Sequence, residues 1–175
     1  RDLWQQFRCV LHESLNVVVG SSACRAVTFP IDHAEHTLLL SRLLVEALHI
    51  PTSCRLEAFM TENRTLRLGP VIGILIEPYV LDGSGHVAKI KAGYLERLAA
   101  AQWNQPAISY LFHCDDIDFN RLTVKAAMPG FGKNGDVRFS MRTLPLPDVI
   151  HNRLFRYRSE TTETFAKLAA MSQDG

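Results

Sequence analysis

Short hydrophobic runs separated by polar turn residues mark the first third of the chain. Such runs are typical of strands. Four of them predict strands, at residues 15–19, 25–29, 55–60 and 65–68. Between the second and third runs, leucines at three- and four-residue spacings predict a helix over 35–49 that ends before Pro51. Residues 1–68 are therefore expected to form a small β-rich unit with one helix, too small for a large independent core.

The pattern changes after Gly69 and Pro70. Residues 71–76 are apolar throughout, which is typical of a strand covered on both faces in a parallel sheet. A helical pattern follows over 86–102, and a second apolar run follows over 107–114. Strand, helix and strand in this order predict a right-handed βαβ unit and an α/β fold class.

Further strands are predicted at 123–128, 137–141 and 147–153, and a closing helix at 159–171 with Ser159 as N-cap. The segment from Gly130 to Gly135 matches G-x-G-x-x-G by letter. That fingerprint binds a dinucleotide only when a helix follows it, whereas alternating residues follow here. A β-hairpin tip is therefore the preferred interpretation.

Residues 144–153 read LPLPDVIHNR. Each proline fixes its own φ and keeps the preceding residue out of the helical region. This order predicts an extended lead into a short buried strand, with Asn152 and Arg153 at its far end. In open α/β sheets, ligands bind outside the carboxyl ends of the strands. Asn152 and Arg153 are accordingly candidate substrate-binding residues.

A glycine-rich loop lies between the first apolar strand and the helix that follows. Four of its residues are candidate substrate-binding positions: Asp82, Ser84, Gly85 and His86. Exposed amides and the positive end of a helix suit a carboxylate or a phosphate. The alternative is a plain connecting loop capped by Ser84.

Two segments carry the letters of a metal site, but neither predicts one. His113 and Cys114 are adjacent on a strand, so their side chains point to opposite faces. A polar strand end is preferred there over a metal site or a Cys–His nucleophile pair. His33 and His36 have helical spacing but no evident third ligand. The four cysteines show no paired spacing, which favours reduced thiols in a cytoplasmic protein.

Composition narrows the function classes further. The 175 residues are 47% hydrophobic and 21% charged, as in ordinary globular proteins, and support one sizeable core or a core with a small satellite. A formal charge of +1 gives no reason to expect nucleic acid or a membrane surface as a partner. Neither a membrane-spanning run nor a signal-peptide pattern is seen.

Three segments together resemble the N-terminal part of YheC/YheD-type proteins, which are endospore coat-associated members of the ATP-grasp superfamily. The segments are RLGPVIGIL at 67–75, YLFHCDDI at 110–117 and LPLPDVIHNR at 144–153. The resemblance covers roughly residues 15–165. It implies a Rossmann-like pre-ATP-grasp domain over 69–175, after the β-rich unit of 1–68. It also implies that Arg153 turns toward the substrate side of a cleft, with Asp148 and Asn152 closing the domain beside it.

The resemblance further implies ATP-dependent ligation of a carboxylate to an amine by the full-length protein. ATP and magnesium would be held by C-terminal ATP-grasp lobes, which this chain is expected to lack. The chain alone is then expected to bind no cofactor and to be catalytically silent. The rival hypothesis is a non-enzymatic scaffold or interaction module with spore-coat proteins as partners, located at the spore coat.

Overall fold

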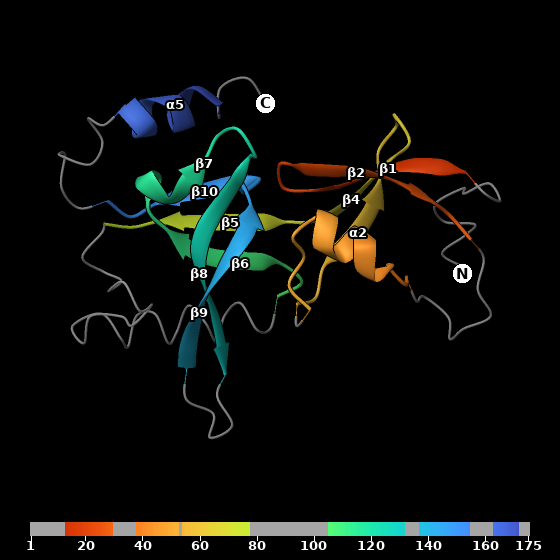
Figure 1. Ribbon diagram of the computed structural model, residues 1–175, viewed down its shortest axis with the longest axis horizontal. Coiled ribbons are helices and arrows are strands. Elements are labelled where there is room, and N and C mark those ends of the chain that lie inside the picture. The colour runs from red at the N-terminus through yellow and green to blue at the C-terminus, as the bar shows by residue number, and fades with distance from the viewer. Residues whose placement is uncertain are drawn as a thin grey trace.

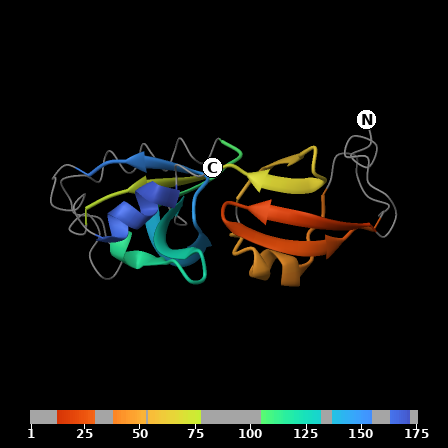
Figure 2. The same cartoon turned by 90° about the horizontal axis from the view of Figure 1, so that it is seen from above.

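The computed structural model describes residues 13–29, 38–52, 54–77, 105–131, 137–154 and 163–171. Its strands form two sheets that follow one another along the long axis of the molecule (Figure 1, Figure 2). The described helices are α2 (Arg42–Ala47), α5 (Glu163–Met171) and the 3-10 turn η3 (Cys114–Asp116). None of the described helices is long and apolar enough to cross a membrane. The chain is thus a β-rich α/β protein.

The first sheet holds four strands in the order β2-β1-β4-β3. Their bounds are Ser14–Val19 (β1), Ser22–Val27 (β2), Glu57–Met60 (β3) and Thr65–Gly69 (β4). The central pair β1 and β4 is parallel, and both outer pairs are antiparallel. All four predicted strands are confirmed, because alternate residues such as Leu15, Val17 and Val19 turn into the core. Strand β2 begins at Ser22, before the predicted start at residue 25, so the turn between β1 and β2 consists of Gly20 and Ser21.

Helix α2 begins later than the leucine spacing predicted. The Ser41 side chain accepts a hydrogen bond from the Leu44 amide at 3.2 Å, which makes Ser41 the N-cap. Residues 38–40 precede this cap and are not helical, so the predicted start was wrong there. Residues 35–37 lie outside the described residues. The helix ends at Ala47 with Leu48 as its C-cap, and His49 then takes a positive φ of 53°.

The second sheet holds six strands, in the order β10-β5-β6-β8-β7 with β9 paired to β8. Their bounds are Val71–Leu75 (β5), Ile108–Phe112 (β6), Ile117–Asp118 (β7), Thr123–Phe131 (β8), Val137–Pro145 (β9) and Val149–Asn152 (β10). Strands β10, β5 and β6 are parallel, as predicted for β5 and β6, while β7, β8 and β9 add antiparallel pairs. The helix predicted over 86–102 lies outside the described residues.

The glycine-rich segment after Gly130 joins two antiparallel strands. Strands β8 and β9 stay in register up to the pair of Phe131 and Val137. Residues 132–136 between them lie outside the described residues. The prediction of a β-hairpin at this segment is therefore confirmed.

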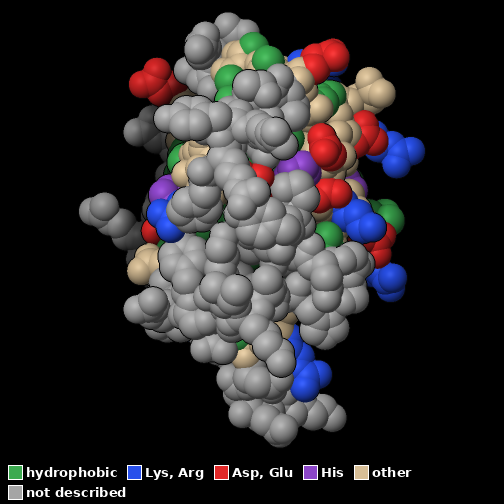
Figure 3. All heavy atoms as spheres, turned by 90° about the vertical axis from the view of Figure 1, so that its left-hand side faces the viewer, with side chains coloured by type: hydrophobic (Ala, Val, Ile, Leu, Met, Phe, Trp, Pro, Cys, Tyr) green, Lys and Arg blue, Asp and Glu red, His purple; other side chains and the backbone are tan. Residues whose placement is uncertain are grey.

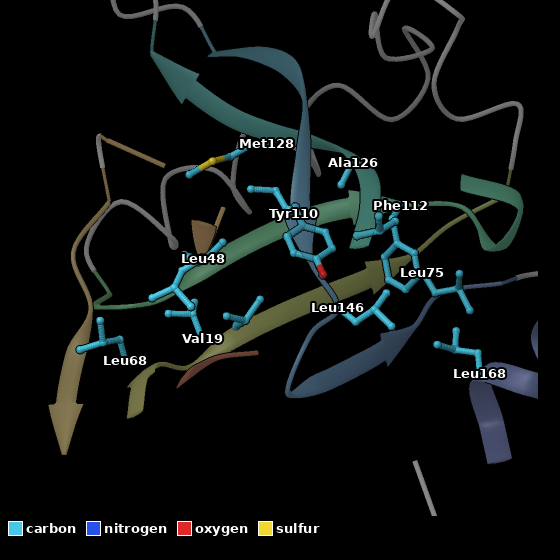
Figure 4. Packing of buried hydrophobic residues seen from close by; sticks show 14 of the residues in the cluster. Val19, Leu48, Leu68, Leu75, Tyr110, Phe112, Ala126, Met128, Leu146 and Leu168 are labelled. Atoms are coloured by element: carbon cyan, nitrogen blue, oxygen red, sulfur yellow. The ribbon is translucent and has the colours of Figure 1, made fainter. Parts of the chain in front are cut away.

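The chain passes from one sheet to the other at Pro70, which follows β4 and precedes β5 across a cis peptide bond with Gly69. One buried cluster nevertheless runs through both sheets (Figure 4). On one side, the cluster contains Val19 and Leu68 of the first sheet and Leu48 at the end of α2. Tyr110 lies between these residues and the Leu75 and Phe112 side chains of the second sheet. The division into domains at residue 69 stays a prediction.

The proline-rich segment that leads to β10 holds this junction together. Within the second sheet, the buried Tyr110 hydroxyl of β6 donates to the Pro145 carbonyl at 2.7 Å and fixes the start of this segment. The Ser21 amide of the first sheet donates to the Leu146 carbonyl at 3.0 Å. Beyond the segment, β10 is not the buried strand that the sequence predicted. It lies at the end of the described sheet, and its first residue, Val149, is 57% exposed.

Candidate functional site

Three parallel strands end at one level and present the residues that follow them at a common edge. Asn152 of β10 is in register with Leu75 of β5, and Leu75 is in register with Phe112 of β6. The next residue of each strand therefore leaves the sheet at the same height. This edge, which we call the strand-end edge, corresponds to the usual position of ligands in open α/β sheets. Figure 3 looks onto this side of the molecule, where acidic and histidine side chains of the described residues reach the surface.

Asn152 and Arg153 lie at the strand-end edge, where the sequence predicted them. The Arg153 amide donates to the Leu75 carbonyl at 2.9 Å, which continues the pairing with β5 by one residue. The Asn152 side chain accepts a hydrogen bond from the Leu154 amide at 3.0 Å and turns the chain away from the sheet. Arg153 is half-buried and Asn152 is exposed. An arginine guanidinium at this position can form bidentate hydrogen bonds with a carboxylate or a phosphate.

The other four predicted substrate-binding residues are Asp82, Ser84, Gly85 and His86. They fall within residues 78–104, outside the described residues. The described segment that contains β5 ends at Glu77, two residues after the strand. These four residues therefore stay predictions.

Sequence reasoning missed Glu77, the acidic residue that follows β5. Its side chain is buried, with only 3% of its surface exposed. Glu77 is the second residue after β5, the strand that lies between β10 and β6. A buried carboxylate is costly unless it is bonded, so it marks a polar position in an apolar setting. The available signal was an acidic residue directly after an unbroken apolar run.

His113 and Cys114 follow β6 and have different structural roles. His113 is the N-cap of η3, and its Nδ1 accepts from the Asp115 amide at 3.3 Å. Cys114 is 1% exposed and belongs to the core cluster. Burial raises the pKa of the Cys114 thiol to about 11, and the nearby charges of Asp115 and Glu77 add to the shift. The thiol is therefore neutral at physiological pH, which agrees with the predicted polar strand end rather than a Cys–His nucleophile pair.

This assignment predicts that Cys114 resists alkylation. At pH 8, iodoacetamide should modify Cys24, which is partly exposed, and leave Cys114 unmodified in the folded protein. The reason is that the raised pKa keeps the Cys114 thiol protonated and the core excludes the reagent. Peptide mapping by mass spectrometry measures both positions, and the same reaction in denaturant is the control. Equal modification of both cysteines in the folded protein would contradict the assignment.

The part of the chain that the structure describes contains no set of side chains that could bind a metal ion. No three His, Cys, Asp or Glu side chains are grouped there closely enough to hold an ion. His33 and His36, which carry metal-like letters in the sequence, lie in residues 30–37 and outside the described residues.

Helix α5 lies close to the strand-end edge. It packs against η3, and its Leu168 side chain is buried in the core cluster on the same side as Leu75 (Figure 4). The described part of the edge thus combines an arginine, an amide and a buried carboxylate. Such groups can orient a polar ligand by charge and hydrogen bonds, and the described residues include no activated nucleophile there.

Comparison of this chain with protein-family models, with curated proteins and with solved structures finds no match.

Proposed function

We propose that this chain forms the substrate-side wall of an ATP-grasp ligase-like protein. In this proposal the strands β10, β5 and β6 belong to a Rossmann-like pre-ATP-grasp domain. Arg153 and Asn152 bind anionic and polar groups of the substrate, and the loop of Asp82, Ser84, Gly85 and His86 completes the wall. ATP and magnesium are held by ATP-grasp lobes supplied outside this chain. The full-length protein then joins a carboxylate to an amine and releases ADP and phosphate.

The observation that supports this proposal most is the pairing of two segments that carry the resemblance. Residues 69–75 and 144–153 are distant in sequence, yet β5 and β10 lie side by side as parallel strands. Their pairing brings the polar Asn152–Arg153 end to the strand-end edge. An arginine and a buried acid that follow the ends of parallel strands are polar groups of the kind that fix a ligand's orientation.

The test is nucleotide turnover by the full-length protein. With ATP, magnesium and a panel of amino acids and short peptides, ADP release is expected only when magnesium and a substrate are both present. Chelation of magnesium by EDTA is the control for non-enzymatic release. The 175-residue chain alone is expected to release no ADP. A full-length protein that neither binds nucleotide with magnesium nor releases ADP with any substrate would refute the ligase proposal.

A second candidate function is a non-enzymatic interaction module, such as a spore-coat scaffold. Large apolar side chains exposed around the first sheet favour it. They include Leu43 at 78%, Leu39 at 60% and Phe59 at 50% exposure. Apolar side chains of this size mark a protein-binding surface where they form one contiguous patch, whereas single ones are ordinary. This candidate is preferred if the turnover test is negative while the full-length protein still co-assembles with coat proteins.

A further inference from the structure

Strand β10 has little buried surface to hold its register. It is four residues long, lies at the end of the described sheet and pairs with β5. Ile150 is partly buried, whereas Val149, His151 and Asn152 are exposed. Register is set strongly only where one face of a strand is buried. A slip by one residue would move Arg153 away from the strand-end edge and reverse the faces of its neighbours.

Asp148 holds the start of β10 through both its backbone and its side chain. The Asp148 amide donates to the Val71 carbonyl at 2.9 Å, and the Asp148 Oδ2 accepts from the Val71 amide at 2.8 Å. One residue therefore satisfies both backbone groups of the first residue of β5. If β10 shifted by one residue, another residue would face Val71 and the side-chain bond would be lost, because Asp148 is the only carboxylate in the segment from Leu144 to Arg153.

The second oxygen of Asp148 connects this point to the first sheet. Asp148 Oδ1 lies 2.8 Å from Nη2 of Arg67, which is part of β4. The Asp148 side chain is 23% exposed and that of Arg67 is 40% exposed, so solvent screens this ion pair in part. Its role is geometric, because it orients the carboxylate toward Val71.

Pro147 supplies a steric limit in the same place. A Cβ on Gly73 would lie 2.7 Å from the Pro147 Cγ, so the proline ring fits only above a residue without a side chain. Along β5, the neighbours of Gly73 on the same face are Val71 and Leu75, so a shift of the proline ring in either direction would bring it against a side chain. The hydrogen bonds of Asp148 and the fit of Pro147 thus select the same register.

We propose that Asp148 is the positioning residue that sets the register of β10 and thereby places Asn152 and Arg153 at the strand-end edge. The far end of the strand is then held by the Arg153 amide on the Leu75 carbonyl. The claim that Asp148 sets the register follows from these contacts alone. Its consequence for a substrate rests on the proposed function of the edge.

Residue-resolved hydrogen exchange in the full-length protein tests the positional part. In Asp148→Ala, the Val71 amide should exchange faster because it loses its acceptor. The Arg153 amide, which has no bond to Asp148, should also exchange faster by about tenfold, because the register is no longer held. The Ile76 amide, bonded to the Phe112 carbonyl between β5 and β6, should be unchanged and serves as the internal control.

Asp148→Asn keeps one acceptor oxygen instead of two, so its Arg153 amide should exchange at a rate between those of wild type and Asp148→Ala. Asp148→Asn also serves as the test variant if Asp148→Ala does not fold. Loss of folding would appear as faster exchange of the Ile76 amide. Unchanged exchange at Arg153 in a folded variant, with only Val71 affected, would overturn the proposal and leave Asp148 as a local cap.

Substrate kinetics in the full-length protein test the functional part. Asp148→Ala should raise KM more than it lowers kcat, and adding Arg153→Ala to it should have little further effect because both changes act through Arg153. Additive losses would overturn the claim that Asp148 acts through Arg153. Absence of any turnover in wild type would refute the proposed function, while the exchange result would still decide the positional part.

Discussion

Replacing Gly20 by alanine should lower the free energy of unfolding by about 3 kcal/mol, because strain at a left-handed φ and a steric clash add together. Gly20 has a φ of +52°, a region that an alanine enters only at a cost. A Cβ there would also lie 2.2 Å from the Leu146 carbonyl oxygen. The obstacle is backbone rather than a flexible side chain, so the two sheets would have to move apart.

The movement would break the hydrogen bonds that join the turn after β1 to the second sheet. The Ser21 hydroxyl donates to the Leu122 carbonyl at 2.7 Å and accepts from the Leu146 amide at 2.8 Å. The Ser21 amide donates to the Leu146 carbonyl at 3.0 Å. These three bonds connect residues more than a hundred positions apart and make the turn the main polar contact described between the sheets besides Arg67 and Asp148.

Chemical denaturation of the two glycine variants measures this effect. Gly130→Ala is the matched control, because the nearest atom to a Cβ on Gly130 is the Arg138 carbonyl oxygen at 3.9 Å, an ordinary contact. It should cost less than about 1 kcal/mol, as most substitutions without a clash do. If both variants had the same free energy of unfolding, the described junction of the sheets would be wrong.

Local patterns predicted most of the strands correctly. The unbroken apolar run of β5 reflects burial on two faces, and the alternation in β9 reflects one face turned toward solvent, so both are visible in the order of residues. The turn after Gly130 was also predictable, because the alternating residues that follow it leave no helix to bind a phosphate.

Other features depend on contacts that no local pattern contains. The leucines at 38 and 39 continue the helical spacing of α2, yet the Ser41 cap starts the helix after them and leaves both leucines exposed. The prolines before β10 indicated a buried strand, but their surroundings show a different role. Pro145 accepts from Tyr110, and Pro147 covers Gly73. These partners are far away in sequence, so the spacing of the prolines gives no sign of them.

The candidate site was predictable only in part for the same reason. Asn152 and Arg153 were recognisable as a polar strand end, and the resemblance pointed to the same residues. Glu77 was not, because its importance comes from its burial between two neighbouring strands, which an acidic residue at the start of a loop does not reveal. Asp148 appeared as part of a motif, whereas its bond to Val71 connects two motifs 77 residues apart.

In the ligase that we propose, replacing Arg153 by alanine in the full-length protein should lower kcat/KM about 100-fold, mainly through a higher KM, because the proposed charge-assisted bidentate contact to the substrate is lost. The backbone bond from residue 153 to the Leu75 carbonyl is kept in the variant, so the strand end itself should stay in place. Arg142→Ala is the matched control. Arg142 is an exposed arginine on β9 whose Nε donates to Ser140 on the same strand.

The kcat/KM of these two variants, measured side by side with the substrate that supports ADP release, tests most directly the claim that the strand-end edge binds substrate. We expect a large loss of kcat/KM in Arg153→Ala and wild-type values of kcat/KM in Arg142→Ala. Unchanged turnover and KM in Arg153→Ala would contradict it.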